Sequence, residues 1–204
     1  LLTAGLPPHL ALGTNKLQSC FGSFTAAVNY SRKGLVRPTE MIWGVVATAA
    51  GAALGTVAIQ LLSATVLNYL IPIMQVQVFL YTLSTPEYGY HDRPARIREL
   101  TFYLPLVFSL GFYDGNFGPG TGSFWALAFV MLLGFNLKKA TAHTKITNFT
   151  SNAAALIFFL IGGKVVFTAG ITMGIGQVIG AYLGSRLVIL RGVGLVRTFL
   201  LTVV

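Results

Sequence analysis

Long apolar stretches separated by short polar ones recur along the whole chain. A helix that crosses the hydrocarbon core of a bilayer needs about 20 predominantly apolar residues. Several stretches reach that length, so the pattern predicts an all-α fold, a polytopic bundle of transmembrane helices. The apolar segments are 11–30, 41–62, 66–83, 99–113, 118–134, 140–161, 165–189 and 195–204.

Two neighbouring segments, 99–113 and 118–134, are short for a full span. Glycine and proline separate them in the sequence Asp114-Gly115-Asn116-Phe117-Gly118-Pro119-Gly120. We expect either two tilted spans or a re-entrant hairpin. A pair of short apolar segments broken by Gly and Pro is a sequence pointer to a transporter binding site, because exposed helix N-termini there favour an anion.

The two halves of the chain align without a gap when the sequence is shifted by 129 residues, the separation of Lys16 and Lys145. The shift also aligns Gly5 with Gly134 and Gly34 with Gly163. We therefore predict two repeats. The first transmembrane repeat covers 1–83, a cytoplasmic loop covers 84–98, and the second transmembrane repeat covers 99–204.

Basic residues predict how these repeats lie in the membrane, because cytoplasmic loops carry an excess of Lys and Arg. The loops at 31–37 and 84–98 are basic and are expected in the cytoplasm, whereas the loop at 162–164 is expected outside. Loops 31–37 and 162–164 are equivalent under the shift. Equivalent loops on opposite sides indicate an inverted-topology repeat, with Gly/Pro-broken short helices.

The second repeat contains a segment, 99–120, whose equivalent would precede Leu1. Its last span also stops at Val204. We expect that an N-terminal hairpin is missing from the first repeat and that the C-terminal end of the second is truncated.

Composition supports a membrane protein and excludes other classes. Of 204 residues, 54% are hydrophobic and 9% charged, and the formal net charge is +9. Mean hydropathy is +0.74. Soluble domains carry about 25% charged residues. The basic residues form no patch interleaved with aromatics, so nucleic-acid binding is not expected, and a single cysteine excludes an intrachain disulfide.

Two apolar segments carry a polar stripe, and these stripes are the candidate substrate site. Lys16, Ser19 and Ser23 share one helix face, and Lys145, Asn148 and Asn152 have the same spacing in the repeat partner. Such faces normally turn toward the protein interior or a water-filled cavity. Interhelical hydrogen bonding is the alternative for the stripes, and snorkelling for the lysines. The candidate substrate-binding residues are Asn15, Lys16, Gln18, Ser19, Gly118, Gly120, Thr121, Ser123, His143, Lys145, Asn148 and Asn152.

Asp114 is the acidic residue well inside the apolar second half. A carboxylate in the membrane is costly and points to function. We predict that Asp114 couples transport to protons. The alternative is a structural cap, because Asp accepts hydrogen bonds from free N–H groups at a helix start.

Two weaker patterns have simpler explanations. Glycines recur at every fourth position, at Gly176, Gly180 and Gly184 and at Gly51 and Gly55, and this spacing is typical of close helix packing. Ser123 near His143 could indicate an intramembrane serine protease, but no residue is evident to orient the histidine.

Three motifs give the chain a family resemblance. They are Leu12-Gly13-Thr14-Asn15-Lys16-Leu17-Gln18, the stretch from Gly111-Phe112-Tyr113-Asp114-Gly115 to Gly118-Pro119-Gly120-Thr121-Gly122-Ser123-Phe124, and Gly134-Phe135-Asn136-Leu137 with Lys139-Ala140-Thr141-Ala142-His143. Together they resemble the TauE/SafE family, most closely its YfcA-type members. The resemblance implies a multi-pass protein of the bacterial inner (plasma) membrane that moves sulfite, sulfonates or related organic anions.

Two hypotheses follow. The chain is a secondary transporter of a small anion, or it is a non-transporting membrane subunit or scaffold whose polar stripes only join helices. The expected partners are a small anion and the lipid bilayer, with a second copy forming a homodimer as a further candidate. No enzyme activity, catalytic residue, cofactor or metal is predicted.

Overall fold

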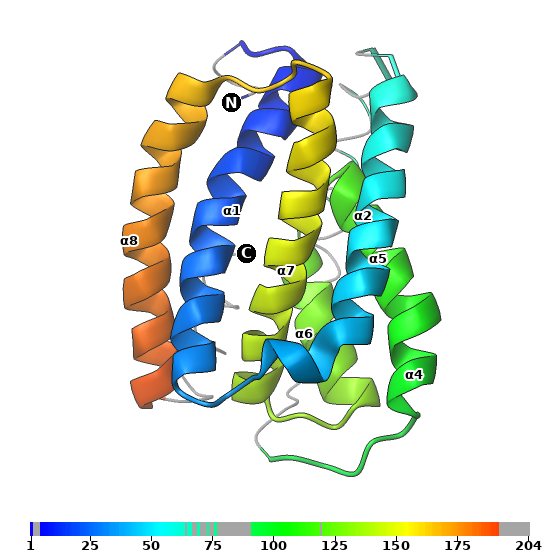
Figure 1. Cartoon of the computed structure of the whole chain (residues 1–204), viewed down its shortest axis with the longest axis vertical. Helices are drawn as coiled ribbons and strands as arrows, with labels where there is room; N and C mark the ends of the chain where they lie inside the picture. The colour runs from blue at the N-terminus through cyan, green and yellow to red at the C-terminus, as the bar shows by residue number, and fades with distance from the viewer. Residues whose placement is uncertain are drawn as a thin grey trace.

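The computed structural model describes residues 1, 5–63, 91–118 and 120–191, together with positions 65, 66, 69, 73 and 76. Every regular element within them is helical, which confirms the all-α prediction (Figure 1). The elements are α1 (Pro8–Arg32), η1 (Pro38–Met41), α2 (Ile42–Leu61), α4 (Glu99–Thr101), η2 (Phe102–Val107), α5 (Phe108–Asn116), α6 (Thr121–Leu132), α7 (Leu137–Ile161) and α8 (Phe167–Arg191).

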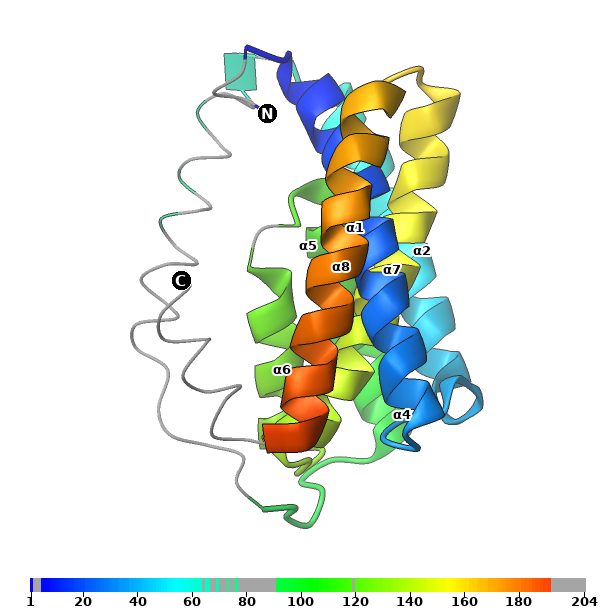
Figure 2. The same ribbon diagram turned by 90° about the vertical axis from the view of Figure 1, so that its left-hand side faces the viewer.

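The long helices form an upright bundle in which α1 packs on α7 and α8, and α7 also packs on α2 and α6 (Figures 1 and 2). In the view of Figure 1, α1 and α8 run downward and α2 and α7 run upward. We call the lower end the basic end. Its described cations flank helix ends and the loop before α4: Arg32, Lys33, Arg37, Arg93, Arg96, Arg98, Lys138, Lys139 and Arg191.

Within the described part of the chain, two helical stretches are long and apolar enough to cross a membrane, Pro38–Leu61 and Phe167–Arg191. Helix α8 exposes large apolar side chains along its length, including Ile175 (60% exposed) and Leu190 (72%), as expected of a surface facing lipid. Helices α1 and α7 are as long but less apolar, because they carry the polar stripes. The predicted segment 195–204 and most of 66–83 lie outside the described residues.

Residues 99–132 form a helical hairpin whose two arms meet the same end of the bundle. The ascending arm is continuous from α4 to α5, with Pro105 accommodated in the π-helical stretch η2. Helix α5 stops at Asn116, part-way up the bundle, and α6 returns to the basic end (Figures 1 and 2). Of the two expected arrangements, this is the re-entrant one.

Small residues allow α5 to lie directly against α2. A Cβ added to Gly51 or Gly55 of α2 would meet the backbone of Phe108 or Phe112, and one added to Gly115 of α5 would meet the backbone of Ala52. The close packing predicted from glycine spacing is therefore confirmed for Gly51 and Gly55. It is not found for Gly176, Gly180 and Gly184 of α8, where an added Cβ would meet no described atom within 4 Å. The contact between α2 and α5 fixes the height at which the hairpin tip is held.

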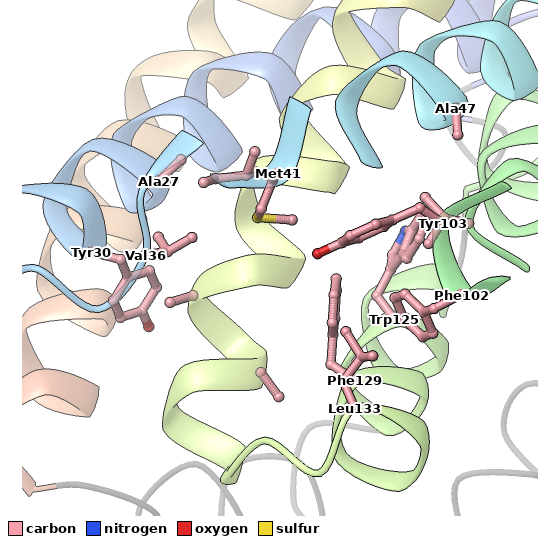
Figure 3. Packing of buried hydrophobic residues seen from close by; sticks show 14 of the residues in the cluster. Ala27, Tyr30, Val36, Met41, Ala47, Phe102, Tyr103, Trp125, Phe129 and Leu133 are labelled. Carbon is pink, nitrogen blue, oxygen red and sulfur yellow. The ribbon is translucent and has the colours of Figure 1, made fainter. Parts of the chain in front are cut away.

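Two apolar clusters fill the bundle at different heights. The larger lies toward the basic end and includes Phe102, Tyr103, Trp125 and Phe129, with Tyr30 from α1 (Figure 3). The smaller joins the opposite ends of α1, α2 and α7 through Leu12, Ile59 and Phe159. The tip of the hairpin lies between these clusters.

Candidate functional site

A buried ion pair joins α1 to the hairpin tip. The ammonium Nζ of Lys16 lies 3.2 Å from Oδ1 of Asp114, and the two residues are 1% and 3% exposed. The same ammonium also donates a hydrogen bond to the backbone carbonyl of Asp114. Because desolvating two charges is costly, such a pair persists in a protein interior only with close geometry and further hydrogen bonds.

The turn after α5 brings backbone close to both charges. Gly118 has φ +86°, a conformation that favours glycine, and a Cβ there would lie 3.1 Å from Nζ of Lys16 and 3.2 Å from Oδ1 of Asp114. Thr121 stabilises the turn, because its Oγ1 donates to the Gly118 carbonyl at 2.7 Å. Any larger side chain at position 118 would crowd the ion pair.

Helix α7 closes the site from the other side. The hydroxyl of Ser151 donates a hydrogen bond to Oδ2 of Asp114, so each carboxylate oxygen has a donor. One turn earlier, Oδ1 of Asn148 is buried and has no hydrogen-bond partner among the described residues. A buried acceptor without a donor is costly and is uncommon in native proteins. We call Lys16, Asp114, Gly118, Asn148 and Ser151 the tip site.

The tip site lies between the two apolar clusters along both long helices. On α1, Lys16 follows Leu12 of the smaller cluster and precedes Tyr30 of the larger one. On α7, Ser151 lies between Ile146 of the larger cluster and Phe159 of the smaller. The charged groups are therefore separated from both ends of the bundle by apolar packing.

The other predicted residues of α1 lie beside the tip site. Asn15 accepts a hydrogen bond from Gln18 through Oδ1 at 2.7 Å. The backbone carbonyl of Ser19 accepts from the Ser23 hydroxyl at 2.6 Å. These contacts stay within α1, which leaves Lys16 as the residue of this stripe with a side-chain partner on another helix.

Lys145 does not join the tip site. Its side chain is partly buried in α7 and has no ion-pair or hydrogen-bond partner among the residues that the structure describes. Lys145 precedes Ser151 by six residues, which is about 9 Å along a helix at 1.5 Å per residue. Asn152, two turns after Lys145, is buried.

Among the described residues, neither His143 nor Ser123 has a side-chain hydrogen bond to the ion pair. The imidazole of His143 bonds the Lys139 carbonyl through Nδ1 at 2.8 Å and packs against the rings of Phe129 and Phe135. In the described part of the chain no hydrogen bond joins it to Ser123, so the geometry gives the serine protease alternative no support. Gly120 starts α6 with φ +73°.

The alternative role of Asp114 as a helix-start cap is wrong. Asp114 lies in the last turn of α5, and its carboxylate accepts from Lys16 and Ser151. The residue that precedes α6 is Gly120, without a side-chain cap. The negative charge is thus used in a tertiary contact between three helices.

Two contacts of the tip site were missed at the sequence level, those of Ser151 and of the Asp114 carbonyl. The stripe of α7 was defined by the spacing of Lys145, Asn148 and Asn152, and Ser151 falls beside that face. Ser151 lies in the polar part of the same helix, but its height relative to Asp114 follows only from the tertiary fold.

Comparisons with known proteins agree along the whole chain. The family described as "Sulfite exporter TauE/SafE" matches residues 1–204. The "Probable membrane transporter protein YfcA" of Escherichia coli (strain K12) is 44% identical over 203 residues, covering 100% of this chain and 76% of that protein. The "Probable membrane transporter protein" of Haemophilus influenzae is 44% identical over 197 residues, covering 97% of this chain and 77% of that protein. The "Probable membrane transporter protein ORF9" of Sinorhizobium sp. is 43% identical over 203 residues, covering 100% of this chain and 78% of that protein. No solved structure matches.

Proposed function

Because this chain belongs to the sulfite exporter TauE/SafE family of membrane transporters, we propose that it is a secondary transporter of a small anion at the bacterial inner membrane. The anion is sulfite, a sulfonate or another small organic anion. The observation that carries the proposal is the buried Lys16–Asp114 pair at the tip of a re-entrant hairpin. Family membership confirms the predicted resemblance and the absence of enzyme activity, and it disfavours a non-transporting scaffold.

The ion pair supports coupling between an anion and a proton. With Asp114 ionised, the pair is neutral, and Lys16 offers little net attraction to a second anion. Protonation of Asp114 would leave the Lys16 ammonium uncompensated in a buried site, where an anion is the obvious partner. Anion and proton then occupy the tip site together and leave together, with Ser151 and Asn148 as further polar contacts.

Lys145 is the second proposed contact for the anion. It is equivalent to Lys16 under the shift of 129 residues, and it has no charged partner within the described ranges. An uncompensated ammonium inside a helical bundle gains most from an anion that passes it. We place Lys145 on the path between the tip site and the basic end, whereas Asn152 follows Ser151 directly on α7 and is a further proposed contact at the tip site.

Several features support an inverted repeat. The shift of 129 residues carries the bounds of α1 (Pro8–Arg32) onto those of α7 (Leu137–Ile161), and these helices run in opposite directions (Figure 1). Gly34 and Gly163 end the two helices with φ +69° and +63°. The residue after each glycine donates its N–H to an equivalent carbonyl, Leu35 to Tyr30 and Lys164 to Phe159. Inverted repeats allow alternating access around a central site.

The basic end is proposed to lie in the cytoplasm. We expect Cys introduced at Lys33 and Arg96, in a Cys20→Ser background, to react with an impermeant maleimide from the cytoplasmic side. Cys at Lys164 is expected to react from the outside. Labelling of positions 33 and 164 from the same side would contradict the inverted topology.

A flux assay tests the function itself. Proteoliposomes with the purified protein should take up one or more of sulfite, sulfoacetate, sulfate and small carboxylates faster than empty liposomes. Lys145→Met should weaken the apparent affinity for that anion by about tenfold, the value of one lost charge-assisted hydrogen bond. Absence of uptake across the panel, from protein that is folded and monodisperse, would contradict the proposal.

A further inference from the structure

At the basic end, residues 91–96 are held as a defined structure across the junction of α6 and α7. The N–H of Arg93 donates to the Gly134 carbonyl at 2.7 Å, and the N–H of Arg96 donates to the Leu132 carbonyl at 2.8 Å. Asp92 accepts from the backbone N–H of Asn136 at 2.6 Å and from its side-chain Nδ2 at 3.0 Å. The arginines are thus presented from a fixed backbone.

Glycine at position 134 makes this close approach possible. Gly134 has φ +72°, and a Cβ there would meet the carbonyl oxygens of Arg93 and Pro94. The loop therefore rests on the α6–α7 turn at backbone contact distance. Ile97, which follows it, packs against the larger apolar cluster.

An open pocket forms where the loop meets α6. One wall is basic, with His91, Arg93 and Arg96, and the other is apolar, with Val130, Met131 and Phe135. Met131 is 36% exposed, so the apolar wall continues onto the outer surface of the hairpin. A third cation lies nearby, because the Lys139 ammonium sits 4.1 Å from the centre of the Phe135 ring.

The pocket's cations have no acidic partner among the residues that the structure describes. Over the described residues the ion pairs are Lys16–Asp114 and Arg37–Glu40, and neither involves Arg93 or Arg96. The carboxylate nearest in sequence, Asp92, binds Asn136. A cavity lined by two arginines that have no acidic partner among the described residues, and by apolar residues of the hairpin, fits a ligand with an anionic head and an apolar tail.

We propose that this pocket binds the phosphate headgroup of an anionic phospholipid. Arginine forms paired hydrogen bonds with phosphate oxygens, and basic pockets beside transmembrane helices bind such headgroups. The acyl chains lie along Val130 and Met131 on the hairpin. The pocket sits at the basic end of the hairpin, away from the tip site, so this proposal does not rest on the transport proposed for the tip site.

The test compares lipids and variants by the rise in Tm of the purified full chain in detergent. Phosphatidylglycerol should raise Tm, whereas phosphatidylcholine and inorganic phosphate should not at equal concentration. The double variant Arg93→Gln/Arg96→Gln should weaken the apparent affinity for phosphatidylglycerol by about tenfold or more. Arg32→Gln/Lys33→Gln, which removes two exposed charges from the same end, should leave it unchanged.

Each other outcome overturns the proposal. If both double variants lose the same apparent affinity for phosphatidylglycerol, the basic end attracts anionic lipid through its overall charge and not through this pocket. An equal rise in Tm with inorganic phosphate would make the ligand a free anion. Unchanged affinity in the Arg93/Arg96 variant would remove the pocket from lipid binding. If that variant does not fold, Arg96→Gln alone serves the same comparison, with Arg32→Gln as its control.

Discussion

Replacing Lys16 by Met is expected to lower the free energy of unfolding by about 3–5 kcal/mol, because removing one partner leaves the other as an uncompensated buried charge. Asp114 is 3% exposed and would retain only the Ser151 hydroxyl as a side-chain donor. The change should be measured by unfolding in mixed detergent micelles, with helical content as the signal.

Lys145→Met is the matched control for this experiment. It removes a lysine from the equivalent position of α7, but that lysine has no acidic partner in the described part of the protein. Its replacement is therefore expected to change stability by less than about 1 kcal/mol. Similar losses in the two single variants would contradict the distinction that the structure draws between these lysines.

A double variant tests whether the stability lost in Lys16→Met comes from leaving the Asp114 carboxylate without its partner. In Lys16→Met/Asp114→Leu both charges are gone, and exchanging a buried ion pair for apolar residues is often neutral or stabilising. We expect the double variant to recover most of the stability lost in Lys16→Met. A double variant that is less stable than either single variant would mean that packing at these positions, rather than charge, sets the stability.

Much of the helical architecture could be predicted from the chain itself. The predicted apolar segments 11–30 and 140–161 fall within α1 and α7, and the two short apolar segments anticipated a broken hairpin. Local signals suffice for this, because apolar length, glycine and proline act within a few residues.

The composition of the tip site was less predictable. Spacing identified Lys16 and Asp114 separately, but their pairing joins residues 98 positions apart in sequence. The spacing of polar residues shows which face of a helix is polar, but it does not show which other helix packs against that face. The spacing of the polar residues does not distinguish Lys16 from Lys145. The structure does, because glycine packing on α2 fixes the height of the hairpin and places the Asp114 carboxylate beside Lys16.

Asp114→Asn is expected to separate anion binding from proton coupling. The asparagine resembles a protonated aspartate in size and lack of charge, so the Lys16 ammonium remains available to an anion at every pH. The variant should bind anion and exchange it across the membrane. It should lose accumulation driven by a pH gradient, because nothing at position 114 can take up and release a proton.

Proteoliposomes give both readouts from one preparation. In the wild type, coupling of one proton to one monovalent anion gives a limiting accumulation of about tenfold per unit of imposed pH gradient. In Asp114→Asn that accumulation should fall to background, while counterflow into vesicles preloaded with unlabelled anion persists.

Ser151→Ala is the matched control, because it removes a hydrogen bond to the carboxylate and keeps the titratable group. It should retain accumulation with altered affinity. Accumulation by Asp114→Asn at the wild-type level would exclude Asp114 from coupling, and loss of counterflow in a folded Asp114→Asn protein would mean that the carboxylate is needed for anion movement itself.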